Sequence, residues 1–388
     1  MPEIRWIEDG VERRARWRSE TGLPLPRRVV VADDRMPADT AYRLACEGTA
    51  LLWRGDFPNA RQLLRAMARR VDRRPPRPGA TPTETFHRVR QARGRRARVL
   101  GMLLVALEDD HSVALRRAPD VRRACLDAYG PPDGPSVTSL RELLGVIGAR
   151  EWRGRGVVVP ALGDRIHPHY GVFSPTRGEY LDLVAEAPLP LVSPLWTDES
   201  TREPYTAFDV GTGTGVLAAI LARRGIDRVV ATDTNPRAVA CARENMARLG
   251  LADRVEVVSS DLFPPGRAAV AVCNPPWLPA TPTSTLEHGV YDPGSRMLLG
   301  FLDGLADHLA PGGEGWLILS DLAERLGLRD GEELPEAIRR AGLRVVGRTD
   351  ARPRHGRAAD PRDPLHFARS AEVTTLWRLA PATPPPLP

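Results

Sequence analysis

The spacing of apolar and polar positions changes near residue 150. Before that point, apolar residues recur mainly with the three- and four-residue spacing of helices. The helices that this spacing predicts cover 39–53, 58–71, 84–107, 120–129 and 137–147. A proline-rich segment, 75–82, separates the second of them from the third. The pattern therefore predicts a helical N-terminal domain over 1–150.

After residue 150, short apolar runs alternate with amphipathic helical patterns. This alternation is typical of α/β domains with a mostly parallel sheet. The predicted strands of the sheet cover 205–210, 228–232, 254–258, 268–273, 316–319, 345–346 and 373–379. We therefore expect a seven-stranded sheet with helices on both faces and one antiparallel strand, over 151–380. The last residues, 381–388, are rich in proline, and the sequence predicts a disordered tail.

A glycine-rich segment follows the predicted strand 205–210. It reads Gly211-Thr212-Gly213-Thr214-Gly215 and leads into a predicted helix, 216–224. Alternate glycines let the backbone turn sharply and approach a ligand, and a helix N-terminus offers unpaired N–H groups. Dinucleotide sites use a similar turn, but with the spacing G-x-G-x-x-G. Here Asp209 stands before the first glycine, in the pattern Asp-x-Gly-x-Gly-x-Gly.

Two acids follow the next two predicted strands. Asp233, with Thr234 after it, ends the strand 228–232, where an acid can accept hydrogen bonds from ribose hydroxyls. Asp261 follows 254–258 and is placed to accept from an adenine amino group, with Leu262 against the ring. Helix capping or simple surface exposure is the alternative interpretation of both acids.

The tetrapeptide Asn274-Pro275-Pro276-Trp277 directly follows the buried run 268–273. Two prolines fix two φ angles and remove two N–H donors. What remains is a rigid turn with backbone carbonyls, one amide and one aromatic ring. These groups suit a planar NH2, which needs acceptors for two protons and an apolar face. An Asn-Pro turn and core packing of Trp277 are the alternatives.

In this order, the motifs resemble those of class I S-adenosylmethionine (SAM)-dependent methyltransferases. The chain is most similar to the N-methyltransferases with an Asn-Pro-Pro-Tyr/Phe/Trp motif, and the HemK/PrmC type, which methylates a glutamine in release factors, is the nearest. The RsmC/RlmG type, which methylates guanine N2 in ribosomal RNA, shares the motif. The resemblance covers about the C-terminal three-fifths of the chain. It implies SAM as cofactor, bound by Asp209, Gly211, Thr212, Gly213, Gly215, Asp233, Thr234, Asp261, Leu262 and Asn274.

The segment before the core follows the layout of the HemK/PrmC hairpin and first helix. It holds an apolar strand, 157–159, and then the run 171–181. The resemblance implies a substrate-binding role for Phe173, Pro175, Arg177, Glu179 and Trp277. Only Pro175 and Glu179 match the Pro-Arg-Pro-Glu-Thr-Glu segment of that family, and Trp277 stands in place of its tyrosine. These departures leave glutamine specificity open, and Arg177 and Glu179 are equally compatible with helix-end charges.

Methyl transfer from a sulfonium is a direct displacement that depends mainly on alignment. We expect the Asn274 side-chain oxygen and the Pro275 carbonyl to accept from the acceptor's two N–H groups and to stabilise the growing positive charge. Pro276 stiffens the turn and Trp277 packs on the substrate plane. A protein glutamine is the leading acceptor. An RNA base (guanine N2 or adenine N6) and a small-molecule amine are alternatives, and a non-catalytic SAM-binding module is a further one.

Charge adds one question about partners. The chain has no lysine, so arginine supplies all 55 basic residues, and the net charge is +6. A GC-rich genome accounts for an arginine excess, which then implies a mild preference for acidic partners. Arginines gather in 88–98 and 352–369, and each segment is either an RNA contact or a solvated face.

Cysteine and histidine usage predicts no metal site. The four cysteines lack paired spacing, which indicates a reduced, cytoplasmic protein. His167-Pro168-His169 has no third ligand in view. The longest apolar stretch, 99–107, is too short to cross a membrane. The oligomeric state is not predicted.

Overall fold

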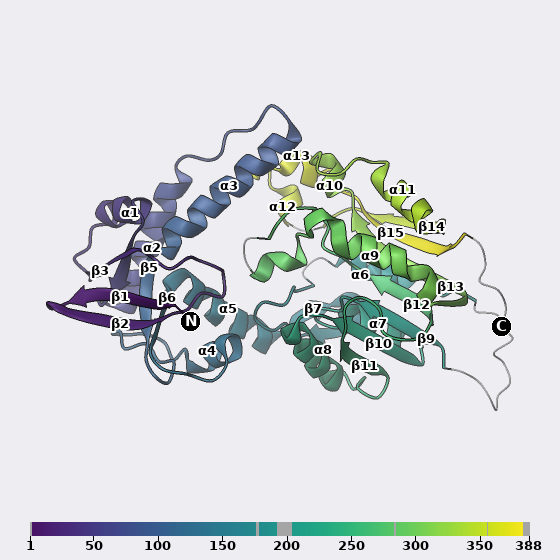
Figure 1. Ribbon diagram of the computed structural model, residues 1–388, viewed down its shortest axis with the longest axis horizontal. Coiled ribbons are helices and arrows are strands. Elements are labelled where there is room, and N and C mark those ends of the chain that lie inside the picture. Colours follow the sequence, from purple (N-terminus) through teal and green to yellow (C-terminus); the bar gives the residue numbers. More distant parts are fainter. Residues whose placement is uncertain (1, 176–177, 192–203, 283–284, 355, 383–388) are drawn as a thin grey trace. The chain divides into compact units, whose positions relative to one another are not determined.

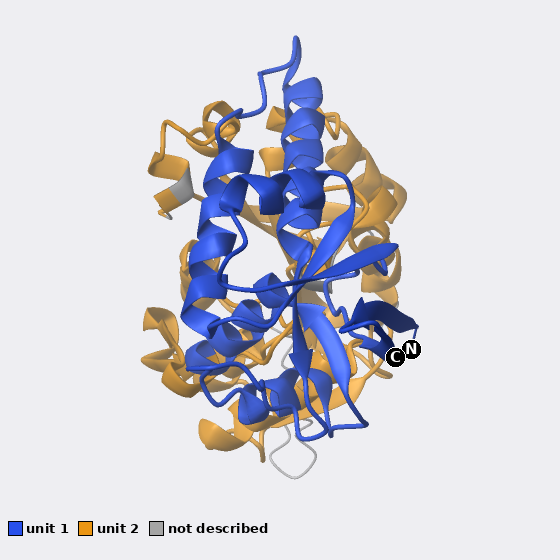
Figure 2. Cartoon of the chain, turned by 90° about the vertical axis from the view of Figure 1, so that its left-hand side faces the viewer, with its two compact units in different colours: residues 1–152, 283–285 blue, residues 153–282, 286–388 orange. Residues whose placement is uncertain are grey.

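The structure is a computed structural model that describes residues 2–175, 178–191, 204–282, 285–354 and 356–382 (Figure 1). The chain forms two compact units (Figure 2). Unit 1 consists of residues 1–152 with 283–285, and unit 2 of 153–282 with 286–388. The boundary lies two residues from the predicted one.

Unit 1 is built on a six-stranded mixed sheet with the strand order β1-β2-β6-β5-β4-β3 (Figure 1). Its strands are β1 (Glu3–Glu8), β2 (Val11–Trp17), β3 (Arg28–Ala32), β4 (Thr49–Trp53), β5 (Leu103–Leu107) and β6 (Ser136–Ser139). Its helices are α1 (Ala38–Cys46), α2 (Phe57–Asp72), α3 (Pro82–Gly101), α4 (Arg122–Tyr129) and α5 (Leu140–Arg155), the last of which crosses the unit boundary.

The sheet of unit 1 corrects the expectation of a purely helical domain. The predicted helix 39–53 ends at Cys46, and Gly48, with φ +83°, turns the chain into β4. The predicted helix 84–107 ends at Gly101, and β5 follows. All five residues of β4 are buried, so this strand lacks the alternation of apolar and polar positions that identifies strands in a sequence.

Unit 2 holds the predicted seven-stranded sheet, with the order β11-β10-β9-β12-β13-β15-β14. Its strands are β9 (Thr206–Val210), β10 (Arg228–Asp233), β11 (Val255–Ser259), β12 (Ala268–Cys273), β13 (Leu309–Ser320), β14 (Leu343–Ala351) and β15 (Thr374–Pro381). β15 runs antiparallel to β13 and β14, and the other neighbouring pairs are parallel. The predicted α/β fold, a seven-stranded and mostly parallel sheet with one antiparallel strand, is confirmed.

Helices cover both faces of this sheet (Figure 1). They are α6 (Glu179–Glu186), α7 (Val216–Arg223), α8 (Pro236–Arg248), α9 (Arg296–Leu305) and α11 (Glu333–Arg340). Ala207, like residues of α6, α7 and α8, belongs to one hydrophobic cluster, and Phe208, like residues of α9 and α11, belongs to another. Consecutive residues of β9 thus face opposite layers, as the two-residue period of a strand requires.

Shorter elements complete unit 2. They are a hairpin, β7 (Val157–Val159) with β8 (Asp164–Ile166), the 3-10 turns η1 (Pro160–Leu162), η3 (Thr285–Gly289), η4 (Pro293–Ser295) and η5 (Ala306–His308), and the short helices α10 (Leu322–Arg325), α12 (Gly356–Ala359) and α13 (His366–Arg369). Among the described helices of the chain, none combines the length and the hydropathy that a membrane crossing needs.

Candidate active site

The register of the sheet brings the predicted motifs together. Val210 of β9 lies between Thr232 of β10 and Cys273 of β12, and all three strands are parallel. The next residues, among them Gly211 and Asn274, therefore leave the sheet side by side at its carboxyl edge. This edge is where open α/β sheets bind their ligands.

The glycine turn needs its glycines for both conformation and space. Gly211, Gly213 and Gly215 have φ values of +74°, +56° and +83°, a region that side chains disfavour. A Cβ at Gly215 would lie 2.9 Å from Cε of Met246 on α8, so a larger residue would push α7 and α8 apart. The turn is tied to β10 because the Thr212 N–H donates to the Thr232 carbonyl at 2.8 Å.

Asp209 supports the turn from inside the protein. Its side chain is buried, and Oδ2 accepts from the Thr212 hydroxyl at 2.6 Å and from the Ala218 N–H at 2.9 Å. Burial raises the pKa of Asp209 to about 6, and the negative charge of Asp233 adds to this. The side chain of Asp209 thus positions Thr212 and the start of α7. A direct contact between Asp209 and the cofactor remains a prediction.

Asp233 lies beside the turn and is partly exposed. Its Oδ2 accepts from the Gly213 N–H at 3.0 Å, and its Oδ1 accepts from the Asn235 N–H at 2.8 Å. Each carboxylate oxygen can accept a second hydrogen bond, so acceptors remain for ribose hydroxyls. Burial raises the pKa of Asp233 above its ordinary range, although the backbone hydrogen bonds oppose this. Thr234, the next residue, is exposed.

The residues after β11 are fixed beside Asp233. Ser259, the last residue of β11, pairs with Asp233 in the sheet, and Asp261 follows with an exposed side chain. Leu262 has a φ of +61°, and its carbonyl accepts from the Thr232 hydroxyl at 2.6 Å. A Cβ at Gly300 of α9 would lie 2.6 Å from Cδ1 of Leu262, so this glycine makes room for it.

The tetrapeptide forms the opposite side of the edge, after β12. Asn274 is half-buried and Pro275 is buried. The indole N–H of Trp277 donates to Oδ1 of Asn274 at 2.9 Å, and the indole packs against both hydrophobic clusters of unit 2. The ring is therefore anchored in the protein, and its N–H fixes which way the Asn274 amide points. One lone pair of Oδ1 stays available to a further donor.

Sequence reasoning missed the residues that tie down the segment after the tetrapeptide. The buried Asp292 accepts from the backbone N–H groups of Met297 at 2.8 Å and Leu298 at 3.4 Å, and so caps α9. Met297 in turn reaches Gly211, because a Cβ there would collide with the Met297 methyl group. The Tyr291-Asp292 pair before Pro293-Gly294 was the available signal, since acids often precede helices.

The predicted substrate-binding residues upstream of the sheet differ in exposure and in their contacts. Phe173 is 42% exposed and contacts the segment after the tetrapeptide, since a Cβ at Gly289 would lie 2.8 Å from that of Phe173. Pro175 is buried. Glu179 is 2% exposed, and its Oε1 has no hydrogen-bond partner among the described residues. Arg177 lies outside the described residues.

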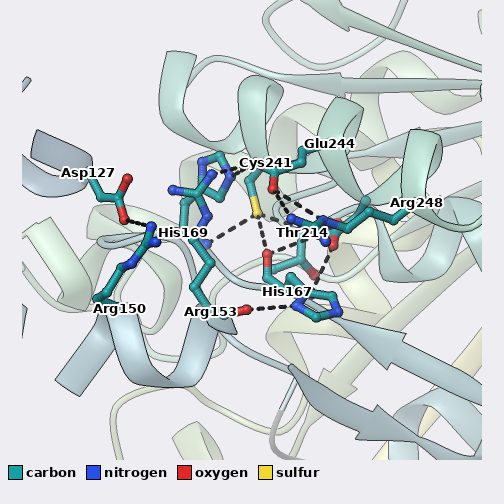
Figure 3. Close-up of polar contacts among 10 residues, drawn as sticks. Asp127, Arg150, Arg153, His167, His169, Thr214, Cys241, Glu244 and Arg248 are labelled. Atoms are coloured by element: carbon teal, nitrogen blue, oxygen red, sulfur yellow. Dashed lines mark hydrogen bonds and ion pairs between the residues drawn. The ribbon is translucent and has the colours of Figure 1, made fainter. Parts of the chain in front are cut away.

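A polar network connects the upstream segment to α8 and to the glycine turn (Figure 3). Asn245 of α8 accepts from the His167 N–H at 2.9 Å and donates to the Thr214 carbonyl at 3.0 Å. Glu244 accepts from Arg153, and its Oε2 lies 2.7 Å from Nε2 of His169. Hydrogen bonds from Arg248, His169 and Arg153 overcome the opposing effect of burial and lower the pKa of Glu244 to about 2.

The hydrogen bonds of this network give His167 and His169 a structural role. Both His167 and His169 are hydrogen-bonded, and the described residues contain no group of three or more potential metal ligands. Asn245 is a second residue that sequence reasoning missed. Its signal was an amide on the buried side of α8, in line with Ala238, Ala242 and Met246.

The chain is similar in sequence to known methyltransferases. Residues 165–322 match a family model described as "Methyltransferase small domain". A release factor glutamine methyltransferase of Cereibacter sphaeroides is 35% identical over 164 residues, 38% of this chain and 56% of that protein. A ribosomal protein L11 methyltransferase of Geobacter metallireducens is 36% identical over 162 residues, 38% of this chain and 51% of that protein. A tRNA1(Val) (adenine(37)-N6)-methyltransferase of Bacteroides thetaiotaomicron is 32% identical over 139 residues, 33% and 57% of the two chains.

The chain thus spans about half the length of the curated relatives that it matches. The match covers β9, β10, β11, β12 and all of β13 in unit 2, with the glycine turn and the tetrapeptide. The family match supports the prediction of a methyltransferase domain in this part of the chain. The roles of its individual residues and its methyl acceptor belong to the proposal that follows.

Proposed function

We propose that this chain, whose second unit holds a class I SAM-dependent methyltransferase domain, transfers a methyl group to an amide or amino nitrogen. One observation carries the proposal. Asn274 and the Pro275 backbone stand at the carboxyl end of β12, next to the glycine turn that follows β9. An NH2 acceptor and a cofactor beside that turn would therefore occupy the same edge of the sheet.

On the cofactor side, each residue has a distinct task. The glycine turn allows a ligand to approach its backbone closely, because Gly211, Gly213 and Gly215 have no side chains. Asp233 accepts from the ribose hydroxyls through its remaining lone pairs. Asp261 and Leu262 flank the base. When bound, SAM supplies a methyl group already activated by the sulfonium.

On the acceptor side, Asn274 and Pro275 orient the nitrogen. Oδ1 of Asn274 and the Pro275 carbonyl accept from the two N–H groups, which aligns the nitrogen lone pair with the methyl group. Both acceptors also stabilise the positive charge that develops on nitrogen. Trp277 holds the Asn274 amide through its indole N–H and offers an apolar surface to the planar acceptor. Glu179 and Phe173 complete the acceptor side in this proposal.

A protein glutamine side chain is the first candidate acceptor. It is supported by the similarity to a release factor glutamine methyltransferase and by the shared Asn-Pro-Pro motif. An RNA base is the second, because a relative is named a tRNA adenine-N6 methyltransferase and because arginines are concentrated in unit 1. Both acceptors present a planar NH2, so the same residues serve either reaction.

Transfer of a labelled methyl group separates these acceptors. The full chain is incubated with methyl-labelled SAM and a lysate, and the products are digested with protease or with nuclease. Label released by protease alone identifies a protein acceptor, and label released by nuclease alone identifies RNA. Label confined to small molecules would contradict both. SAM binding without any transfer would leave a non-catalytic SAM-binding module. Asn274→Ala is the matched control, since it removes the proposed acceptor-side amide and leaves the glycine turn, Asp233 and Asp261 in place.

A further inference from the structure

The positive charge of the chain is concentrated in one helical pair of unit 1. Residues 61–98 contain 13 of the 55 arginines and only two of the 49 acids, Asp72 and Glu84. This tenth of the chain carries a formal charge of +11. Because the whole chain carries +6, all other residues together carry −5. A general arginine bias would spread the charge evenly, so composition alone does not explain this concentration.

The segment folds as α2, a loop and α3, and the two helices contact each other (Figure 1). Their apolar residues, such as Leu63, Met67, Phe86 and Val89, are buried. On α2, Arg61, Arg65 and Arg69 are exposed at four-residue spacing, and neighbours in this row are about 6 Å apart along the helix axis.

Most of these arginines form no ion pair with an acid among the described residues. Nine of the 13 are exposed and make no hydrogen bond or ion pair within the part of the chain that the structure describes. They are Arg61, Arg65, Arg69, Arg73, Arg74, Arg77, Arg93, Arg95 and Arg98. The other arginine-rich segment, 352–369, differs in this respect. There Arg354, Arg362 and Arg369 pair with Asp182, Asp360 and Asp363.

We propose that the exposed arginines of residues 61–98, which we call the α2–α3 surface, bind the phosphate backbone of RNA. Guanidinium groups match phosphate oxygens in geometry and charge. A protein partner fits less well, because protein interfaces have an apolar centre and none of the exposed large hydrophobic side chains of the described residues lies in 57–101. Phe86 is 1% exposed, so among the described residues of the surface only the exposed imidazole of His87 is available for base stacking. Phosphate contacts therefore dominate, and we expect binding to depend little on base sequence.

The proposal does not depend on the methyl acceptor. RNA held at the α2–α3 surface is compatible with methylation of the RNA itself and with methylation of a protein bound to RNA. It also stands if the methyltransferase proposal fails, because RNA binding and SAM binding are measured separately.

The test uses the full chain and a fluorescein-labelled, mixed-sequence single-stranded RNA. One variant carries Arg61→Gln, Arg65→Gln and Arg69→Gln. The matched control carries Arg13→Gln, Arg14→Gln and Arg123→Gln, three exposed arginines of unit 1 that lie outside the surface. Both variants lose three charges. Fluorescence anisotropy gives Kd over a series of salt concentrations, and SAM affinity and thermal unfolding are measured in parallel.

We expect the α2 variant to raise Kd for RNA about tenfold or more. We also expect it to reduce the slope of log K against log salt by about 2, since each lost phosphate contact contributes about 0.7 for a single strand. The control should retain wild-type binding, and both variants should keep wild-type SAM affinity and stability. Equal losses in both variants, absence of RNA binding by the wild type, or stronger competition by polyglutamate than by unlabelled RNA would each overturn the proposal.

Discussion

At the scale of single residues, the site depends on side chains whose hydrogen-bonding capacity is only partly used. Asp233 holds two backbone N–H groups and still has lone pairs for a ligand. Asn274 accepts from Trp277 and keeps one lone pair on Oδ1. Asp209, by contrast, is buried behind the turn and serves its geometry. These differences lead to three predictions.

Replacing Asp233 by alanine should weaken SAM binding. Hydrogen bonds to a charged group contribute about 1.5–3 kcal/mol, so Kd should rise roughly ten- to a hundredfold. Asp253→Ala, which removes an exposed carboxylate between α8 and β11, is the control. Isothermal titration calorimetry at several pH values adds a check. Because burial raises the pKa of Asp233, wild-type affinity should fall as the pH drops and this carboxylate becomes protonated.

Trp277→Phe should lower turnover without changing SAM affinity. Phenylalanine keeps an aromatic ring but removes the indole N–H that fixes the Asn274 amide. We expect kcat to fall about tenfold, equivalent to about 1.4 kcal/mol, whereas Asn274→Ala abolishes turnover. Single-turnover methyl transfer at saturating SAM measures the effect. A wild-type kcat in Trp277→Phe would show that the indole hydrogen bond has no positioning role.

Asp209→Asn should change how stability depends on pH. The pKa of Asp209 is raised to about 6 in the folded protein, so the folded state favours the protonated carboxyl. In the wild type, the protonated Asp209 carboxyl therefore adds to the free energy of unfolding at acid pH. This contribution, on the order of 3 kcal/mol, is lost as the pH rises through 6. Because asparagine does not titrate, the unfolding free energy of the variant should not show this decrease with rising pH. Urea unfolding between pH 4 and pH 8 compares the two, and parallel curves would contradict the assignment.

At the scale of elements, the motif-bearing strands were the easiest to predict from sequence. The glycine turn and the tetrapeptide marked the ends of β9 and β12, and the predicted run 268–273 coincides with β12. β4 and β5 were assigned to helices, because a strand buried on both faces reads as a continuous apolar run. Gly48 marked the change after α1, but a single glycine does not tell whether a strand or a helix follows.

The contacts that complete the site could not be predicted because they join distant segments. Met297 meets Gly211, and Leu262 meets Gly300, in each case across many residues of intervening chain. The sequence around Met297 or Leu262 does not indicate which distant glycine the side chain contacts. The cap of α9 illustrates the same limit, since Asp292 accepts from N–H groups beyond a turn in which Ser295 has a φ of +55°.

The cap of α9 leads to a prediction at this scale. Asp292→Ala should destabilise unit 2 by about 0.5–2 kcal/mol, the usual cost of losing an N-terminal cap. It should also weaken SAM binding, because Met297 would no longer be held against Gly211. Asp303→Ala removes an exposed acid from the same helix and is the control. Thermal unfolding and calorimetry report the two effects, and an unchanged melting temperature would exclude the capping role.

At the scale of the whole molecule, the two units carry different properties. Unit 2 contains the seven-stranded sheet and the residues of the proposed site, and unit 1 contains the α2–α3 surface. Each unit has a sheet and buried apolar residues of its own, as expected of domains that fold separately.

Separate expression of the units should therefore separate the two binding activities. A fragment of residues 153–388 should bind SAM within about threefold of the full chain and should lose most affinity for RNA, since it lacks the arginines of 61–98. A fragment of residues 1–152 should bind RNA and not SAM. Circular dichroism first establishes that each fragment is folded. Loss of SAM binding by a folded 153–388 fragment would show that unit 1 contributes to the cofactor site.

The amide of Asn245 joins the backbone of His167 to that of Thr214. A ligand that shifts the glycine turn must therefore also act on the segment that leads to Phe173 and Glu179. Such coupling is reciprocal by thermodynamic necessity: if SAM changes the affinity for the methyl acceptor by some factor, the acceptor changes the affinity for SAM by the same factor. Asn245→Ala removes this amide, so the factor by which each ligand changes the affinity for the other should approach one. Each ligand would then bind equally well before or after the other.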